Sequence, residues 1–359
     1  MKVLQVIESL TAGGAERLVI ELAGEYVSLG VDSHVLCLSS PGPWASRISE
    51  NGIYVGCLDK RPGIDLRVLP RLRKTIASLR PDVVHTHLFT ANLWTRLAGL
   101  PRRDWGLVVT LHNIDNWRGR THLFADSLLA HAADCYVGVS GAVTDYYAGL
   151  GLSRSRLATI LNGIHSNGEL FPQPLTRPVP LLRACGRLVE KKGFALLPSV
   201  ASFLKKRGID FKMEIIGDGP ERGKIEAAIH LLGLADCVHL LGERDDARRL
   251  IGECDVFIMP SFGEGLPLVV LEALHAGRPV VTTDLPGLAG VVDNGAEALL
   301  VPMGSPRDIA GAVASLIACP DQARAMARAG RVRAKKHFSI ERTAASYLDL
   351  YKSLLKSRS

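Results

Sequence analysis

The stretch 255–283 constrains the fold more than any other part of the sequence, because it contains a strand, a turn, a helix and a second strand in direct succession. The apolar run 256–259 is too short for a helix and lacks alternation, which is typical of a strand buried on both faces. A turn at 260–265 leads into an apolar helix at 266–275, and Gly277 ends that helix before the next strand begins. This succession predicts a parallel sheet covered by helices.

Two carboxylates accompany the start of this helix. Glu264 stands in the turn, and Glu272 lies about two turns into the helix. The turn follows a strand, so it lies where open α/β sheets bind ligands, and the N–H groups of Gly265, Leu266 and Leu268 favour an anion there. A lone glutamate in a helix is usually a solvent-facing acid, but a carboxylate also accepts two hydroxyls of a sugar or ribose. The residues alone leave both interpretations open.

The letters E-G-L-P-L-V-V-L-E at 264–272, followed by A-L-H-A-G-R-P-V-V, resemble the signature of glycosyltransferase family 4. That family consists of retaining, nucleotide-sugar-dependent enzymes of the GT-B fold. The resemblance implies an α/β chain of two Rossmann-like parallel-sheet domains facing a central cleft, with a C-terminal helix crossing back to the first domain. It also implies that Glu264 is catalytic and lies beside the donor sugar, that Glu272 binds the ribose, and that Gly265 and Leu266 contact the donor.

A second group of candidates follows the apolar strand 181–185, where the sequence reads G-R-L-V-E-K-K-G. Arg187 offers a bidentate fork and Lys192 a mobile point charge, so together they can grip a diphosphate. An ordinary surface turn rich in basic residues would have the same composition, so the residues alone leave both interpretations open. The resemblance implies that Arg187 and Lys192 form the donor-pyrophosphate element and act in catalysis. It further implies that Gly13 and Gly14, after the first strand, form a glycine loop near the donor phosphate.

Histidines mark the ends of two strands in the first half of the chain. The run P-D-V-V-H-T-H-L predicts a buried strand ending at His85 and His87, and His112 directly follows the strand 107–111. A zinc site using His112 as a third ligand and a satisfied loop histidine are both compatible with this spacing. The resemblance implies instead that His112 contacts the donor sugar as a catalytic residue and that His87 lines the cleft on the acceptor side.

The polar loop 113–120, which reads N-I-D-N-W-R-G-R, is the candidate acceptor loop. In GT-B enzymes, loops after this strand seat the acceptor. The resemblance therefore implies that Asn113 and Trp117 lie on the acceptor side.

Prolines divide the sequence into two parts. Four of the ten residues in 171–180 are proline, which predicts a stiff, extended linker. A chain of 359 residues also exceeds one ordinary core. We therefore expect a first domain over 1–170 and a second domain over 181–338. The resemblance implies that the first is the acceptor-side domain, that the second binds the nucleotide-sugar donor, and that a helix at 339–359 packs on the first domain.

Composition limits the partners and the compartment. A net charge of +7 suggests an anionic ligand or surface, and the basic helix 66–78 is either a solvated face or a surface that meets anionic lipid. Aromatic residues are not interspersed among the basic residues, so we expect no nucleic acid partner.

Cysteine usage and the N-terminus bear on the compartment. Seven singly scattered cysteines favour buried thiols in a reducing compartment. A first strand at 1–7 followed by Glu8 is unlike a signal peptide, and no apolar run approaches the ~18 residues of a membrane span. We expect a cytoplasmic protein, with peripheral contact at the inner face of an anionic membrane as the alternative.

Together with the resemblance, these residues predict a retaining hexosyl transfer from a nucleotide diphosphate sugar to a hydroxyl. Negative charge develops on the leaving diphosphate, where Arg187, Lys192 and the helix start at 265–268 converge. No D-x-D motif occurs, so we expect these cations to replace a metal ion and no cofactor to be needed. The expected donor is a UDP-sugar, with GDP-mannose as the alternative. The expected acceptor is a glycan or lipid-linked hydroxyl in polysaccharide, lipopolysaccharide or glycolipid biosynthesis.

Other classes of function stay open at this point. A nucleotide-sugar epimerase or a phosphorylase on the same fold would use the same donor residues. A dinucleotide-dependent oxidoreductase would require G-x-G-x-x-G and an acid ~20 residues further on, and the sequence lacks this pattern. A non-catalytic binding module would not need the full set of cations and carboxylates.

Overall fold

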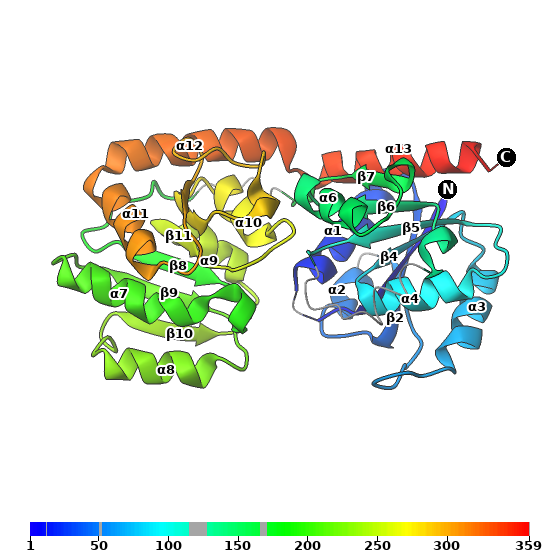
Figure 1. Ribbon diagram of the computed structural model, residues 1–359, viewed down its shortest axis with the longest axis horizontal. Coiled ribbons are helices and arrows are strands. Elements are labelled where there is room, and N and C mark those ends of the chain that lie inside the picture. Colours follow the sequence, from blue (N-terminus) through cyan, green and yellow to red (C-terminus); the bar gives the residue numbers. More distant parts are fainter. Residues whose placement is uncertain (12, 50–51, 115–127, 166–170, 359) are drawn as a thin grey trace. The chain divides into compact units, whose positions relative to one another are not determined.

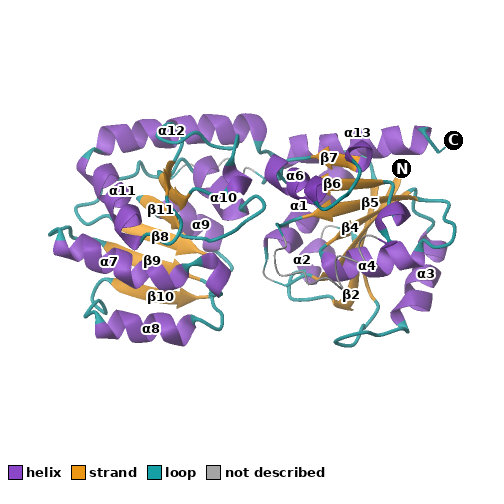
Figure 2. Cartoon of the chain, in the orientation of Figure 1, coloured by secondary structure: helices purple, strands orange, loops and turns teal. Residues whose placement is uncertain are grey.

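The protein consists of two compact units. Met1–His165 and Ile340–Ser359 form the first unit, and Ser166–Ser339 form the second. Each unit is built on a parallel sheet with helices packed against it (Figure 1, Figure 2). The computed structural model describes residues 1–11, 13–49, 52–114, 128–165 and 171–358.

In the first unit, the described residues form seven parallel strands in the order β3-β2-β1-β4-β5-β6-β7. The strands are β1 Lys2–Ser9, β2 Asp32–Ser40, β3 Tyr54–Cys57, β4 Val83–His87, β5 Gly106–Leu111, β6 Cys135–Gly138 and β7 Leu157–Thr159. The helices are α1 Gly14–Ser28, α2 Ala45–Ser49, α3 Val68–Leu79, α4 Phe89–Ala98, α6 Gly141–Gly149 and α13 Ile340–Lys356. Every residue of β4 and β5 is buried, as expected for central parallel strands covered on both faces.

The C-terminal helix α13 belongs to the first unit (Figure 1). Its apolar residues recur every three to four positions, so they form one stripe along the helix. From that stripe, Tyr347 and Tyr351 pack against Val83 and Val108 of the sheet and against Tyr26 of α1. The predicted return of the last helix to the first domain is confirmed.

In the second unit, six parallel strands within the described ranges run in the order β10-β9-β8-β11-β12-β13. The strands are β8 Leu181–Cys185, β9 Lys212–Ile216, β10 Val238–Gly242, β11 Val256–Met259, β12 Val280–Thr283 and β13 Leu299–Val301. The helices are α7 Leu197–Lys206, α8 Arg222–Leu231, α9 Ala247–Glu253, α10 Leu268–His275, α11 Pro306–Ala318 and α12 Pro320–His337. The stretch 255–283 therefore folds as the strand, turn, helix and strand that its sequence predicts.

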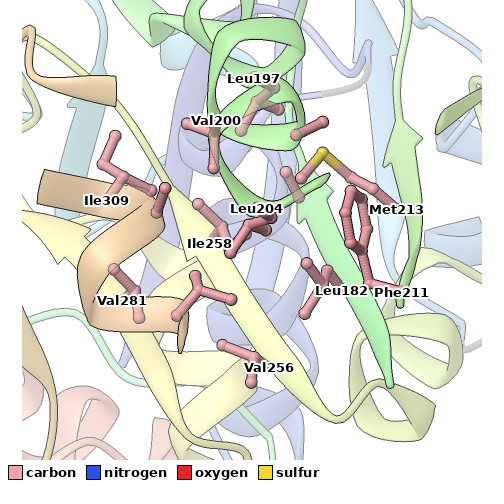
Figure 3. Packing of buried hydrophobic residues seen from close by; sticks show 14 of the residues in the cluster. Leu182, Leu197, Val200, Leu204, Phe211, Met213, Val256, Ile258, Val281 and Ile309 are labelled. Atoms are coloured by element: carbon pink, nitrogen blue, oxygen red, sulfur yellow. The ribbon is translucent and has the colours of Figure 1, made fainter. Parts of the chain in front are cut away.

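The core of the second unit fixes the ends of its central strands. Figure 3 shows Leu182 of β8 and Ile258 of β11 packed with Leu204 of α7 and Ile309 of α11, all nearly inaccessible to solvent. Burying each such side chain contributes roughly 1.5–3 kcal/mol relative to leaving it exposed. The loops that leave β8 and β11 therefore start from rigid positions.

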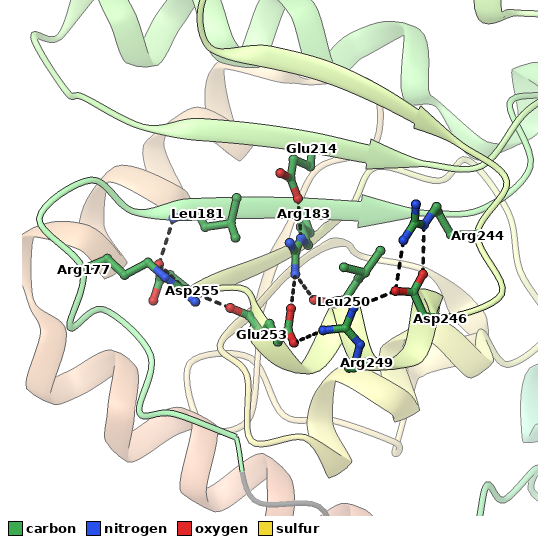
Figure 4. Close-up of polar contacts among 10 residues, drawn as sticks. All are labelled: Arg177, Leu181, Arg183, Glu214, Arg244, Asp246, Arg249, Leu250, Glu253 and Asp255. Atoms are coloured by element: carbon green, nitrogen blue, oxygen red, sulfur yellow. Dashed lines mark hydrogen bonds and ion pairs between the residues drawn. The ribbon is translucent and has the colours of Figure 1, made fainter.

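The proline-rich segment 171–180 lies against the second unit. The buried Asp255 accepts hydrogen bonds from the N–H groups of Leu175, at 2.7 Å, and Leu181, at 2.8 Å. It also pairs with Arg177 at 3.1 Å (Figure 4). A buried carboxylate requires such partners. The segment predicted to be a linker is therefore fastened to the residue that precedes β11.

The loop before α3 exposes aliphatic side chains beside a basic helix. Ile64 is 87% exposed and Leu66 is 73% exposed. Between them, the buried Asp65 accepts hydrogen bonds from the N–H groups of Arg61 and Arg67 and also binds the Arg67 guanidinium. These bonds hold the turn in a fixed shape. In the described part of the chain, no helix has both the length and the apolar character needed to cross a bilayer.

Candidate active site

The strand order reverses once in each sheet, and most of the predicted site residues lie at these two reversals. The first sheet reverses between β1 and β4, and the second between β8 and β11. Ligands of open α/β sheets bind beyond the carboxyl ends of the strands at such points. Gly13 follows β1 and His87 ends β4, whereas Arg187 follows β8 and Glu264 follows β11.

In the second unit, the loops after β8 and β11 pack backbone against backbone. Gly193 has a φ of 68°, and a Cβ atom built on it would lie 2.1 Å from the carbonyl oxygen of Pro260. A Cβ atom on Gly287 would lie 2.2 Å from the carbonyl oxygen of Gly265. Only glycine allows this approach at both positions. The turn that carries Glu264 is therefore held on two sides.

Lys192 and Glu264 meet directly across these loops. The Lys192 Nζ lies 2.6 Å from Glu264 Oε1, and the Ser261 hydroxyl donates to the same oxygen at 3.0 Å. Glu264 is 9% exposed, whereas the Lys192 side chain is 25% exposed. The carboxylate thus sits behind an ammonium group that reaches solvent.

The other two predicted donor-site side chains of the second unit, Arg187 and Glu272, differ in their surroundings. Arg187 is exposed, and no hydrogen bond or ion pair joins its side chain to any residue in the described ranges. Glu272 is only 3% exposed on α10. That helix begins at Leu268, two residues after its predicted start at 266, with Pro267 as its N-cap. Leu266 is buried in the turn before it.

In the first unit, His112 directly follows β5 and is partly exposed. Its Nε2 lies 3.1 Å from the Nδ1 of His87, which ends β4 and is fully buried. Two neighbouring parallel strands therefore bring these histidines together. In the structure His87 contacts His112 and His85, and its predicted place on the acceptor side stays a prediction.

His85 lies behind His87 on the same face of β4. Its ring centroid is 4.1 Å from that of His87. Its Nδ1 lies 2.7 Å from the Tyr351 hydroxyl, and its Nε2 lies 2.6 Å from the Thr110 hydroxyl. Burial lowers the pKa of His85 to about 3, the pKa of His87 well below its usual range, and the pKa of His112 to about 4. The three imidazoles are therefore neutral at neutral pH.

The remaining predicted residues have less defined surroundings. Gly13 is the N-cap of α1, and Gly14 is the exposed first residue of that helix. Asn113 is partly buried after His112, whereas Trp117 lies outside the described residues. Among the side chains that the structure describes, no three His, Cys, Asp or Glu residues are grouped as a metal site.

Two family models cover most of the chain. The model described as Glycosyltransferase Family 4 matches residues 12–167, and the model described as Glycosyl transferases group 1 matches residues 179–319. EpsF of Bacillus subtilis (strain 168), assigned as a glycosyltransferase, is 30% identical in an alignment of 311 residues, and the match covers 79% of this chain and 79% of EpsF. The chain belongs to glycosyltransferase family 4.

Other relatives and solved structures match nearly the whole chain. The lipopolysaccharide core biosynthesis glycosyltransferase LpsE of Rhizobium meliloti (strain 1021) is 25% identical over 345 residues, covering 95% of this chain and 96% of LpsE. HepE of Anabaena, solved in complex with UDP and glucose, superposes with a TM-score of 0.88 at 21% identity, covering 99% of this chain and 100% of HepE. The likeness to HepE confirms the fold class, two parallel-sheet α/β domains of the GT-B type.

Several contacts of the predicted residues in each unit had not been predicted. Ser261 binds Glu264 from within the signature turn, and its position three residues earlier was the available signal. Tyr351 binds His85 across 266 positions of sequence, and no local pattern links the two. The letters H-T-H at 85–87 did contain one usable signal. Alternate residues of a strand point to the same face, so His85 and His87 lie on one face of β4.

Proposed function

We propose that this family 4 enzyme transfers a hexosyl group from a UDP-sugar to a hydroxyl of a glycan or lipid-linked acceptor, with retention of the anomeric configuration. The bond from the anomeric carbon to the leaving phosphate oxygen breaks, and the acceptor oxygen bonds to that carbon on the same face. The acceptor proton passes to the leaving phosphate. The product belongs to polysaccharide, lipopolysaccharide or glycolipid biosynthesis.

One observation carries this proposal: an exposed guanidinium and a partly exposed ammonium both follow β8 at the strand reversal of the second unit, and the ammonium pairs with a buried carboxylate. Arg187 has its donors available to an anion, and Lys192 can reach the same anion from its position against Glu264. Both would stabilise the charge that develops on the diphosphate, which is the main electrostatic demand of the reaction. We propose that these cations serve in place of a metal ion, so no cofactor is required.

The other residues receive roles from the same chemistry. Glu264 accepts hydroxyls of the donor sugar, and Glu272 accepts those of the ribose. His112, as a neutral ring at a strand end, hydrogen-bonds a sugar hydroxyl. The choice of UDP is supported by the UDP and glucose bound to HepE, and the choice of product by the name of LpsE.

Substitution of the cations tests the donor site. Arg187→Ala and Lys192→Ala should each lower the rate of transfer ~100-fold, or about 3 kcal/mol, and should weaken the thermal stabilisation by UDP-sugars. Arg328→Ala, which removes an exposed charge on α12, is the matched control and should leave both unchanged. The melting temperature without nucleotide should be the same in wild type, Arg187→Ala and Arg328→Ala. Near-wild-type turnover in Arg187→Ala or in Glu264→Ala would refute the assignment.

The reaction products separate transfer from its rivals. Incubation with the donor alone should leave its sugar configuration unchanged, whereas an epimerase would alter it. A phosphorylase would require inorganic phosphate. The anomeric configuration of the transferred sugar, measured by NMR, should equal that of the donor.

We further propose that the first unit contacts an anionic membrane through the loop that carries Ile64 and Leu66. The turn held by Asp65 keeps two aliphatic side chains in solvent beside the exposed Arg71 and Lys74 of α3. Aliphatic side chains enter the interfacial region of a bilayer, and each basic residue near the surface adds ~1 kcal/mol.

Vesicle binding tests this contact. Cosedimentation with vesicles containing phosphatidylglycerol should weaken as salt is raised. It should weaken further in Ile64→Ser with Leu66→Ser, whereas neutral vesicles should bind neither protein. Wild-type binding by the double variant would exclude this loop.

A further inference from the structure

The buried His87 lies between two other histidines and has a single hydrogen bond. Its Nδ1 faces His112 Nε2 at 3.1 Å. Its Nε2 is buried and has no hydrogen-bond partner among the residues that the structure describes. The two rings thus share one hydrogen bond, and the position of its hydrogen decides which nitrogen of His112 can donate.

The neutral state of both rings leaves two arrangements. In one, His87 carries its hydrogen on Nδ1 and donates to His112 Nε2, which leaves His87 Nε2 as a buried acceptor. In the other, His112 donates from Nε2 and His87 carries its hydrogen on Nε2, which leaves a buried N–H without an acceptor. Orphaned buried N–H groups are rarer in proteins than under-satisfied acceptors, so the first arrangement is favoured.

We propose that His87 is a positioning residue that donates its Nδ1 hydrogen to His112 Nε2 and thereby fixes His112 as the Nδ1–H tautomer. His112 then presents its Nδ1–H as a hydrogen-bond donor to a sugar hydroxyl, while its Nε2 is occupied. This inference rests on the role proposed for His112 in transfer. His87 itself touches no substrate, because its side chain is fully buried.

The C-terminal helix holds this arrangement from behind. Tyr351 of α13 and Thr110 of β5 occupy both nitrogens of His85, so that ring cannot rotate without losing two hydrogen bonds. The His85 ring lies 4.1 Å from His87 and limits its tilt. Residues separated by most of the chain length thus orient the histidine that faces the ligand.

The tautomer of His112 is measured directly in the wild-type protein. A long-range ¹H–¹⁵N correlation spectrum of the ¹⁵N-histidine-labelled chain distinguishes a protonated nitrogen from an unprotonated one in each ring. The His112 signals are assigned from the spectrum of His112→Gln. We expect Nδ1 of His112 to be protonated and Nε2 to be unprotonated. Protonation of Nε2 would overturn the proposal, without any need for a variant or an active assay.

Two substitutions at position 87 then separate the hydrogen bond from packing. Asparagine keeps an N–H donor near the Nδ1 position, so His87→Asn should retain the tautomer and a kcat within about threefold of wild type. His87→Leu removes the donor and should lower kcat roughly 10–100-fold with little change in the donor KM. His112 should then show both tautomers. Equal loss in both variants would overturn the proposal, because ring packing would explain it. Absence of transfer in wild type would instead refute the proposed function and leave the tautomer result standing.

Discussion

Acid should destabilise the first unit by an amount that His85 allows us to calculate. Burial lowers the pKa of His85 to about 3 in the folded chain, from 6.5 as an ordinary histidine. Because the folded pKa is the lower one, the unfolded chain binds the proton more tightly. The stability that the neutral ring confers is complete above pH 6.5 and is lost as the pH falls from there towards the folded pKa.

The magnitude follows from these two values. Between about pH 7.5 and about pH 5, protonation of the unfolded chain at this one site lowers the free energy of unfolding by ~2 kcal/mol. With a urea m-value of about 2 kcal/mol/M, this corresponds to a shift of ~1 M in the midpoint. His85→Gln cannot titrate, so its midpoint should shift ~1 M less than that of wild type over the same interval.

The sequence supplies a probe that reports on the first unit alone. All four tryptophans, Trp44, Trp94, Trp105 and Trp117, lie in residues 1–165, and the second unit has none. Urea titrations followed by tryptophan fluorescence therefore measure unfolding of the first unit. His131→Gln removes an exposed histidine as the matched control and should keep the full shift. An unchanged pH shift in His85→Gln would refute the argument that this buried ring resists protonation.

Three further outcomes are expected. Gly193→Ala should destabilise the second unit by more than ~2 kcal/mol in urea titrations followed by circular dichroism, because position 193 has a φ of 68° and a Cβ atom there would clash with Pro260. Gly208→Ala is the control: its φ is 70° but the space around it is open, so it should cost only ~1 kcal/mol. Equal losses in the two variants would contradict the clash. Glu264→Gln should bind free UDP roughly tenfold more tightly by calorimetry, since Lys192 loses its carboxylate partner, and weaker binding would contradict the competition. Transfer should continue at the wild-type rate in excess EDTA, and loss restored by a divalent ion would contradict metal independence.

The second unit was largely predictable because its site residues lie in short, continuous stretches. A buried strand followed by a turn and a helix start fixes where Glu264 stands relative to the sheet, whatever the rest of the chain does. The same holds for Arg187 and Lys192, which lie five positions apart after another strand. Parallel strands end at the same edge, so these two stretches had to meet if β8 and β11 were neighbours, as they are.

The contacts that could not be predicted join residues that are distant in sequence. Periodicity indicates that Tyr351 lies on the buried stripe of its helix, but not that its hydroxyl meets His85. The prolines of the segment 171–180 predict a stiff linker. Its contact with Asp255 depends on where β11 begins, which a local pattern does not encode. In both cases a polar atom must find a partner once it is buried, and only the packed structure specifies which one.

The ion pair between Lys192 and Glu264 changes how donor recognition should be understood. From the sequence, the ammonium and the carboxylate had separate roles, one toward phosphate and one toward sugar. In the structure they neutralise each other at 2.6 Å, so a phosphate that attracts Lys192 must compete with Glu264. Free UDP offers the carboxylate nothing in return. A complete UDP-sugar brings hydroxyls that Glu264 can accept while the diphosphate takes Lys192, so both charges regain partners at once. Under the proposed function, the pair would therefore favour the intact donor over the spent nucleotide and would assist release of UDP after the sugar has been transferred.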